Sequence, residues 1–277
     1  MEKILLLAGA NSKHLLTMGS LFDGIGGFPL ASERCGITPL WASEIEAFPI
    51  EVTKRRFPYM LHVGDITKLD GGELPPVDII CGGSPCQDLS VAGARRGLDG
   101  ERSGLFMEQI RVTKEMRIAD ERRGRTNQLI RPRWFCWENV PGAFSSGTPK
   151  YEDFRIVLEE IVRIKSNSVY VPRPHPWTWQ PAGRILLGTD FSLAWRVFDA
   201  QYWPRTPQRR RRIFLVADFG GLTAPQILFK QDSLPGYSEE SERTRQGIAA
   251  AAQDGPHDAG GTSPCGPAAR GDEGVPY

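Results

Sequence analysis

The chain has 277 residues and a net charge of +1, with 40% hydrophobic and 24% charged residues. This composition is typical of a globular protein with one large core, or one and a half domains. No stretch approaches the ~18 apolar residues that a membrane span needs, and the run Ile4–Ala8 is too short for a signal peptide core. We therefore expect that the chain neither spans a membrane nor is exported, and that its five cysteines are reduced thiols. The spacing of these cysteines fits no zinc-binding pattern.

From residue 17 to about 219, short apolar runs alternate with helical patterns. Apolar runs of this kind between helices indicate a sheet that is buried on both faces, so we predict a mostly parallel α/β fold. The predicted strands, in chain order, are 18–22, 40–44, 60–63, 77–82, 134–138, 193–199 and 213–219. The predicted helices are 28–35, 46–56, 105–118 and 154–164.

Two regions lack such a pattern. Residues 166–192 contain four prolines and two tryptophans, which predicts a long loop without a regular element. Of the 31 residues 247–277, 18 are Gly, Ala or Pro. This segment has too few large apolar side chains to offset the conformational entropy that it would lose on folding. The expected organisation is an extension over 1–16, a catalytic domain over 17–222 and a low-complexity, disordered tail over 223–277.

Basic residues are concentrated in two segments. Residues 111–133 hold eight basic residues against three acids, and 205–212 hold five arginines, whereas acids exceed bases from residue 230 onward. This distribution permits a phosphate-binding face. A solvated helix face with a solvated tail explains it equally well.

A glycine-rich turn over 22–27 (Phe-Asp-Gly-Ile-Gly-Gly) joins the first predicted strand to a helix. Such a turn lets a ligand approach the backbone, although plain tight turns use the same residues. Glu44 ends the next strand, where an acid can accept hydrogen bonds from a ribose, and Asp65 ends the third, where it can accept an adenine amino proton. One acid at a strand end is usually a helix cap; two in register with a glycine turn favour a nucleoside cofactor.

Cys86 follows the buried fourth strand in the sequence Gly-Ser-Pro-Cys-Gln. Ligands of open α/β sheets bind at the carboxyl ends of strands, so this thiol is expected in the crevice. The usual role of a free cysteine, a small apolar filler, suits Cys81 and Cys136 within their strands better. Glu138 ends the fifth strand in the same crevice, where a carboxyl that shares a proton would make a catalytic pair with Cys86.

The run Gln208–Ile213 carries four arginines. Alternate residues of a strand share a face, so Arg210 and Arg212 point one way and Arg209 and Arg211 the other. One pair can face the crevice while the other meets solvent or phosphate.

On these motifs the chain resembles the bacterial and phage cytosine-C5 DNA methyltransferases, from Ser20 to about Phe219. The resemblance implies a Rossmann-like, S-adenosylmethionine-dependent methyltransferase fold with a mostly parallel twisted sheet, helices on both faces and a terminal antiparallel strand. It implies that the cofactor, S-adenosyl-L-methionine, is bound by Phe22, Gly24, Gly26, Gly27, Glu44, Ile45, Asp65, Ile66, Pro85 and Leu105. The implied catalytic residues are Cys86, Glu138, Arg210 and Arg212, and the implied substrate contacts are Gln87, Ser90, Asn139 and Val140.

The resemblance also implies a mechanism on a cytosine flipped out of double-stranded DNA. Cys86 adds to C6, Glu138 hydrogen-bonds or protonates N3, and C5 takes the methyl group; a base then removes the C5 proton and Cys86 leaves. Arg212 holds the cytosine O2, and Arg210 positions the nucleophile loop or a phosphate. Asn139 serves more as a scaffold than as a chemical participant, and no metal is required.

Three departures from the family stand out. A basic insert lies near 117–132, and the segment 202–206 is a residue longer than usual. The target-recognition region and the two last motifs of the family are not found. The sequence therefore predicts a truncated enzyme or one part of a split enzyme, in which a C-terminal partner chain supplies the missing region.

Alternatives remain open at this stage. They are an inactive or partner-dependent remnant of such an enzyme, a member of the tRNA-methylating branch, a Rossmann dehydrogenase, and a nucleic-acid-binding module. The glycine spacing departs from Gly-x-Gly-x-x-Gly and argues against the dehydrogenase. A binding module leaves Cys86 and Glu138 unexplained. The expected location is the bacterial cytoplasm or a phage-infected host.

Overall fold

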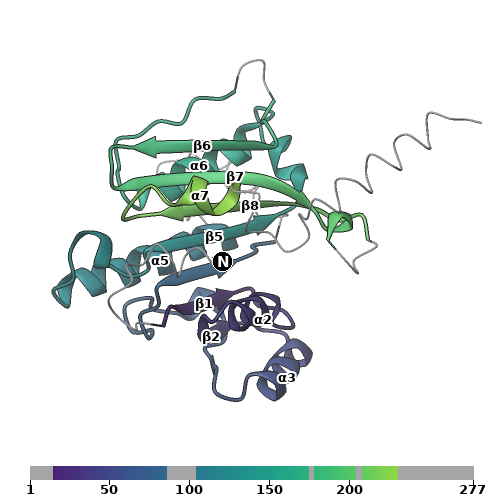
Figure 1. Cartoon of the computed structure of the whole chain (residues 1–277), viewed down its shortest axis with the longest axis vertical. Coiled ribbons are helices and arrows are strands. Elements are labelled where there is room, and N and C mark those ends of the chain that lie inside the picture. The colour runs from purple at the N-terminus through teal and green to yellow at the C-terminus, as the bar shows by residue number, and fades with distance from the viewer. Residues whose placement is uncertain (1–14, 86–103, 175–177, 204–207, 230–277) are drawn as a thin grey trace, which may run out of the picture. The chain divides into compact units, whose positions relative to one another are not determined.

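The computed structural model describes residues 15–85, 104–174, 178–203 and 208–229 (Figure 1). Within them, the strands are β1 (Thr17–Leu21), β2 (Thr38–Ser43), β3 (Leu61–His62), β4 (Ile79–Gly82), β5 (Trp134–Asn139), β6 (Ala182–Leu187), β7 (Phe191–Asp199) and β8 (Arg211–Asp218). The helices are α2 (Gly27–Arg34), α3 (Ala47–Arg56), α5 (Leu105–Arg122), α6 (Glu152–Arg163) and α7 (Ala224–Phe229). None of these helices is long and apolar enough to cross a membrane.

In the described part of the chain, the strands form one sheet in the order β3-β2-β1-β4-β5-β8-β7-β6. Neighbouring strands from β3 to β5 are parallel. The pairs β5–β8, β8–β7 and β7–β6 are antiparallel. The predicted α/β fold with a parallel sheet is confirmed, but three antiparallel pairings stand where one terminal antiparallel strand was expected.

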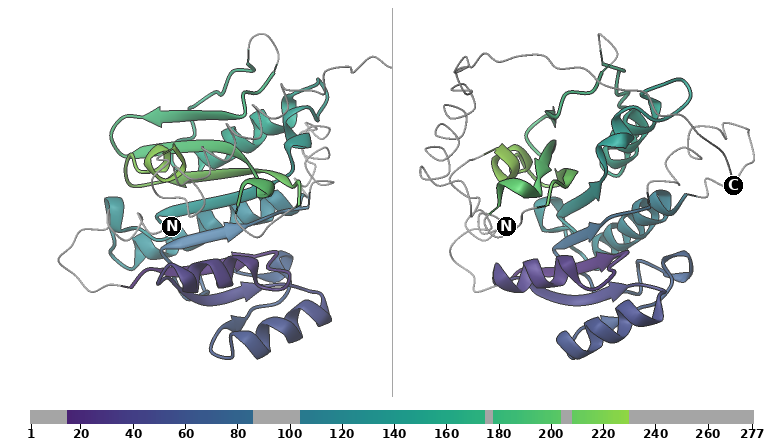
Figure 2. Two further views of the ribbon diagram at one scale, coloured as in Figure 1. Left: turned by 45° about the vertical axis from the view of Figure 1, so that its right-hand side comes forward. Right: turned by 90° about the vertical axis from the view of Figure 1, so that its right-hand side faces the viewer.

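Successive residues of the central strands enter two different cores, as the two-residue period of a strand requires. Ile80, Phe135 and Trp137 belong to a core to which α5 and α6 contribute. Ile79 and Trp134 belong to a second core, which α7 joins and against which α2 packs. Figure 2 (right) shows these helices on opposite sides of the sheet. The uninterrupted apolar runs that predicted a sheet buried on both faces therefore have a direct structural counterpart.

The interpretation of 166–192 as a loop without a regular element is wrong, because β6 lies within it. This strand pairs on one side with β7, and its residues alternate between exposed and partly buried. Gly183 is required there, since a Cβ atom would lie 2.1 Å from the ring of Trp195. The prolines on its N-terminal side dominate the composition of the window and conceal a short edge strand.

The folded region continues past residue 222, where the tail was expected to begin. In α7, Ala224 and Leu228 are buried in the second core. The helix is fastened by Thr223, whose hydroxyl accepts a hydrogen bond from the Trp134 indole at 3.0 Å. From residue 230 onward the expected tail lies outside the described residues, so its disorder stays a prediction.

Part of the basic insert is buried, although residues 121–124 and 126–129 are exposed. Helix α5 runs to Arg122, four residues beyond the predicted end. Arg117 is buried, donates to the carbonyl of Pro132 at 2.6 Å and lies over the Phe219 ring. The buried carboxylate of Asp120 pairs with Arg131 at 3.2 Å. These arginines are therefore not part of a phosphate-binding face.

Candidate functional site

The carboxyl ends of the five parallel strands share one edge of the sheet, and the predicted site residues follow them. Phe22 comes after β1, Glu44 after β2, Asp65 after β3 and Pro85 shortly after β4, while Glu138 lies at the end of β5. This edge is where open α/β sheets bind ligands.

The glycine turn owes its shape to left-handed backbone conformations. Phe22, Gly24 and Gly26 have φ of 54°, 57° and 85°. At Gly26 a Cβ atom would also lie 2.8 Å from the Phe57 ring, so no other residue fits there without rearrangement. Helix α2 starts at the next residue, the exposed Gly27. A Cβ atom at Gly24 or Gly27 would meet nothing within 4 Å, so the turn is open at these two residues, at the start of a helix.

Glu44 joins this turn to the next strand end. Its Oε2 accepts the Gly24 N–H at 2.7 Å, and its Oε1 accepts the N–H groups of Ile45 at 2.8 Å and Glu46 at 3.0 Å. A carboxylate has roughly four acceptor positions, of which these bonds occupy three. Ile45 itself is 69% exposed, so its side chain is available to a ligand.

Asp65 caps the short 3-10 helix η1 (Ile66–Lys68). Its Oδ1 accepts hydrogen bonds from the Thr67 N–H at 3.0 Å and hydroxyl at 2.8 Å. These bonds lower the pKa of the Asp65 carboxyl. Oδ2 lies 3.6 Å from the ammonium of Lys68, whose side chain is largely exposed. Ile66 is buried, so its side chain belongs to the core.

Asp23 is a residue of the turn for which the sequence suggested no role. Its side chain is 6% exposed, Oδ1 accepts the Ser20 hydroxyl at 2.6 Å, and Oδ2 has no hydrogen-bond partner among the described residues. Burial raises its pKa to about 6; the bond from Ser20 acts in the opposite direction, and the charge of Glu44 raises the pKa further. An acid within a glycine turn was the available signal.

Glu138 and Arg212 meet across the β5–β8 pair. The Arg212 Nε lies 2.9 Å from Glu138 Oε1, and the two side chains are 22% and 25% exposed. The second carboxylate oxygen is close to Gly83, where a Cβ atom would be 3.0 Å from Oε2. Glycine at that position therefore lets the carboxyl of Glu138 approach the segment that leads from β4 to Cys86.

Ser84 fastens that segment to β5, a role that the sequence did not reveal. Its hydroxyl accepts the Trp137 indole N–H at 3.0 Å, and its carbonyl accepts the Asn139 amide at 2.9 Å. The Asn139 oxygen in turn accepts the Val140 N–H at 2.8 Å. Asn139 is buried, and these bonds are the scaffold role expected of it.

Of the remaining expected residues, Arg210, Pro85 and Leu105 are described. Arg210 is exposed and precedes β8, with its backbone N–H bonded to Asp199 at 3.0 Å. Pro85 is exposed, and Leu105 is the partly buried first residue of α5. Three predicted residues, Cys86, Gln87 and Ser90, lie outside the described residues.

Comparison with known proteins agrees with this arrangement. A family model described as C-5 cytosine-specific DNA methylase matches residues 16–165. The type II methyltransferase M1.ScrFI of Lactococcus lactis subsp. cremoris is 43% identical over 223 residues, which are 80% of this chain and 43% of that protein.

Two further relatives cover a similar part of the chain. A DNA N-6-adenine-methyltransferase of Escherichia phage P1 is 34% identical over 224 residues, 73% of this chain and 28% of the phage protein. The type II methyltransferase M2.BsuMI of Bacillus subtilis is 31% identical over 214 residues, 77% and 44% of the two chains. The chain thus spans less than half the length of these relatives.

Proposed function

Because the chain belongs to the C-5 cytosine-specific DNA methylase family, we propose that it transfers a methyl group from S-adenosylmethionine to C5 of cytosine in DNA. The observation that carries the proposal is the ion pair of Glu138 and Arg212 beside Gly83, three residues before the predicted nucleophile Cys86. An acid, a cation and a thiol at one strand edge are the groups that addition to a pyrimidine requires.

The residues at the cofactor edge fit a nucleoside. The remaining acceptor position of Glu44 can take one ribose hydroxyl, and Ile45 offers an exposed apolar surface to a base. Asp65 can accept the adenine amino proton at Oδ2, since the exposed Lys68 can turn away. The free space beside Gly24 and Gly27, where a Cβ atom would meet nothing within 4 Å, suits the amino-acid end. S-adenosylmethionine supplies an electrophilic methyl group on its sulfonium.

The proposed chemistry starts with addition of the Cys86 thiolate to C6, which breaks the C5–C6 double bond. Glu138 donates a hydrogen bond or its proton to N3, so the electron pair collects at C5 as an enamine. C5 then takes the methyl group, and the carbon–sulfur bond breaks so that S-adenosylhomocysteine leaves with that electron pair. Loss of the C5 proton to a base re-forms the double bond, and Cys86 leaves as a thiolate. All electrons are accounted for without a metal or a redox step.

The arginines orient this reaction. Through its Nε, Arg212 holds Glu138, and its Nη1 donates to the Arg211 carbonyl at 2.8 Å, which fixes the plane of the guanidinium. A guanidinium has five N–H groups, so Arg212 has further donors for the cytosine O2. Arg210, exposed just before β8, would contact a phosphate or the nucleophile loop.

The finer parts of the proposal concern DNA and its location. The reactive base must leave the duplex to reach a crevice at the strand ends, so a flipped cytosine is required. Gln87, Ser90 and Val140 are expected to contact it, and Pro85 and Leu105 the cofactor. The expected location is the bacterial cytoplasm or a phage-infected host, in keeping with the bacterial and phage relatives.

A C-terminal partner chain is a further part of the proposal. Ile25 and Phe48 lie on either side of the Glu44 junction and are both mostly exposed. A partner that supplies target recognition would cover such side chains. Adding the C-terminal part of the Lactococcus relative should raise methylation by this chain. Robust sequence-specific methylation without it would remove the partner from the proposal and leave the chemistry intact.

The test is transfer of a tritiated methyl group to mixed DNA, followed by mass spectrometry of the nucleosides. We expect 5-methylcytosine, and trapping of the chain on 5-fluorocytosine DNA. Cys86→Ser should abolish both, while the matched variant Cys35→Ser, at the end of α2, retains both. The phage P1 relative is named as an N-6-adenine methyltransferase, so N6-methyladenine is the alternative product. Its production, or trapping of the Cys86→Ser variant, would overturn the proposal.

A further inference from the structure

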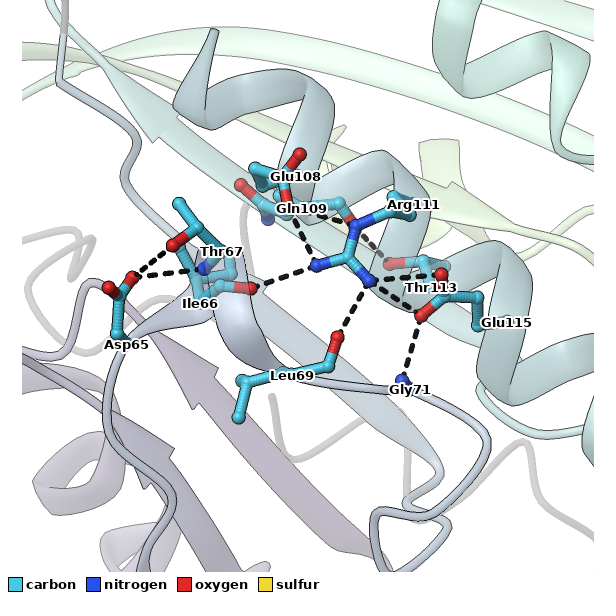
Figure 3. A network of polar contacts seen from close by, with 10 residues as sticks. All are labelled: Asp65, Ile66, Thr67, Leu69, Gly71, Glu108, Gln109, Arg111, Thr113 and Glu115. Atoms are coloured by element: carbon cyan, nitrogen blue, oxygen red, sulfur yellow. Dashed lines mark hydrogen bonds and ion pairs between the residues drawn. The ribbon is translucent and has the colours of Figure 1, made fainter. Parts of the chain in front are cut away.

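Arg111 of α5 makes a set of contacts that neither the sequence nor the proposed chemistry explains (Figure 3). Its Nε and Nη2 both donate to Glu108 Oε2, at 2.9 and 2.6 Å. Nη1 donates to Glu115 Oε1 and Oε2 at 2.9 and 2.8 Å. These two acids precede and follow Arg111 by about one helical turn, so they hold the guanidinium in a fixed direction.

The same guanidinium reaches across to the segment that follows β3. Nη2 donates to the Ile66 carbonyl at 2.9 Å, and Nη1 donates to the Leu69 carbonyl at 2.7 Å. All five N–H groups of the guanidinium are thus used. Glu115 completes the contact, because its Oε2 accepts the Gly71 N–H at 2.8 Å. The segment Asp65–Gly71 is therefore bonded to α5 at three of its residues.

This segment begins with the residue expected to recognise adenine. Asp65 is tied within the turn by its bonds to Thr67, and the next residue, Ile66, is tied to Arg111. The position of the Asp65 carboxylate relative to the sheet edge therefore depends on α5. Without Arg111, the Leu69 carbonyl would lose this donor, and the Ile66 carbonyl would keep only the Leu69 N–H at 3.3 Å. The bond from Gly71 to Glu115 and the buried Ile66 side chain would still hold the turn, but the backbone next to Asp65 would no longer be bonded to α5.

We propose that Arg111 is a positioning residue, which fixes the turn Asp65–Gly71 against α5 and thereby sets the enzyme's preference for the adenine ring of its cofactor. The inference rests on the proposed function. In sequence, α5 follows the segment that contains Cys86 and begins at Leu105.

The geometry requires arginine and not merely a positive charge. Lysine has three donors on one atom and cannot reach two acids and two carbonyls that surround a planar fork. Arg111→Lys keeps the charge and should nevertheless fail to fix the turn Asp65–Gly71 against α5. Glu108 and Glu115 are partly exposed, so neither is left as a buried unpaired charge when Arg111 is replaced, and the variants should fold.

The experiment measures calorimetric Kd values for S-adenosylmethionine and for its inosine analogue, in which an oxo group replaces the adenine amino group. The unchanged chain should prefer the adenine form. Arg111→Met and Arg111→Lys should each weaken its binding by roughly tenfold, about 1.4 kcal/mol, and bring the two Kd values closer together. Loss of stability alone would weaken both ligands equally and leave their ratio unchanged.

Arg123→Met is the matched control. Arg123 caps the other end of α5 and donates to the Gly72 carbonyl at 2.7 Å, beyond the turn in question. In Arg123→Met, the ratio of the Kd values for the inosine and adenine forms should equal that of the unchanged chain. Glu115→Gln, which keeps an acceptor for Gly71, provides a milder second variant and should shift the ratio in the same direction.

The outcomes separate the two proposals. An unchanged ratio in folded Arg111→Met and Arg111→Lys overturns the role of Arg111 and leaves the methyl-transfer proposal standing. Failure of the unchanged chain to bind either ligand overturns the proposed function, and the inference with it. A ratio that falls in the Arg111 variants, but not in Arg123→Met, supports the positioning role.

Discussion

Two arginine-rich segments of this chain differ in where their arginine side chains lie. In 111–133, Arg117, Arg131 and Arg133 are buried or nearly so, and each is bonded to carbonyls or carboxylates of the interior. In 209–212, the first three arginines are exposed, and only Arg212 turns inward, to Glu138. Arg122 and Arg123 of the first segment are exposed as well, so it is the three bonded arginines of that segment that hold the fold together. The second segment lies at the candidate site.

The difference shows that local charge does not reveal what a basic segment binds. A buried guanidinium is tolerated only where acceptors surround it, and such acceptors come from other parts of the chain. Asp218, which receives Arg133, is 85 residues away in sequence. Arginines without such partners stay in water, where phosphate can reach them.

The largest effect is expected from Arg133→Met. Its guanidinium binds Asp218, a fully buried acid, at 2.9 Å, so the variant leaves a buried carboxylate unpaired. We expect the free energy of unfolding to fall by about 3–5 kcal/mol. Urea unfolding measures it, with exposed Arg122→Met as the control. A loss comparable to that of the control would mean that Arg133 belongs with the surface arginines.

Arg212→Met should act on catalysis instead. Since the pair with Glu138 is partly exposed, the expected loss of stability is below about 1 kcal/mol. The rate of methyl transfer should fall roughly 10²–10³-fold, as on removal of a preorganised donor. Single-turnover rates and thermal melting, measured on the same preparation, test both statements. A marked fall in stability with an unchanged rate would place Arg212 with the structural arginines.

Asp23 is a buried acid without an arginine partner among the described residues, and its pKa can be compared with that of Asp218. At Asp218, burial raises the pKa, but the bonds from Arg133 and Thr223 outweigh it, and the net shift is downward. At Asp23 the pKa rises from 3.8 to about 6. The stability that this acid contributes is therefore present below pH 3.8 and is lost as the pH rises through about 6.

Asp23→Asn should remove that loss. Relative to the variant, the unchanged chain should lose up to about 3 kcal/mol of unfolding free energy between pH 3.8 and pH 8, at about 1.4 kcal/mol per pH unit. Urea unfolding at both ends of this range measures it. Ser20→Ala removes the hydrogen bond that lowers the Asp23 pKa, so it should raise this pKa further and increase the total loss of unfolding free energy. Parallel curves for Asp23→Asn and the unchanged chain would contradict the upward shift.

The smallest effect belongs to the exposed arginines. Arg209→Gln and Arg211→Gln should each reduce the salt dependence of DNA binding by about one unit of the log–log slope, and leave stability unchanged. Affinity measured over a series of salt concentrations provides the slope. Arg122→Gln, on the exposed end of α5, is the control and should leave it unaltered. Equal slopes in all three variants would show that neither arginine meets a phosphate.

The sequence by itself determined where the site is. Parallel strands end at the same edge of a sheet, so acids placed at their carboxyl ends lie along that edge, as Glu44, Asp65 and Glu138 do. The alternation of residues in a strand put Arg210 and Arg212 on one face, and the resemblance to the family assigned Arg212 to the crevice, where it meets Glu138. Period and position are local properties, and both can be read without knowing the neighbours.

Only the tertiary structure decided which polar groups remain available. Glu44 is largely occupied by backbone N–H groups, Ser84 joins two strand ends, and Arg111 ties α5 to the turn after β3. Except for the bonds of Glu44 to Ile45 and Glu46, these bonds join segments that are distant in sequence, as in the separation of 45 residues between Ile66 and Arg111. Whether an arginine binds a substrate or stabilises the fold depends on the acceptors that folding brings to it, and no local pattern of residues encodes those acceptors.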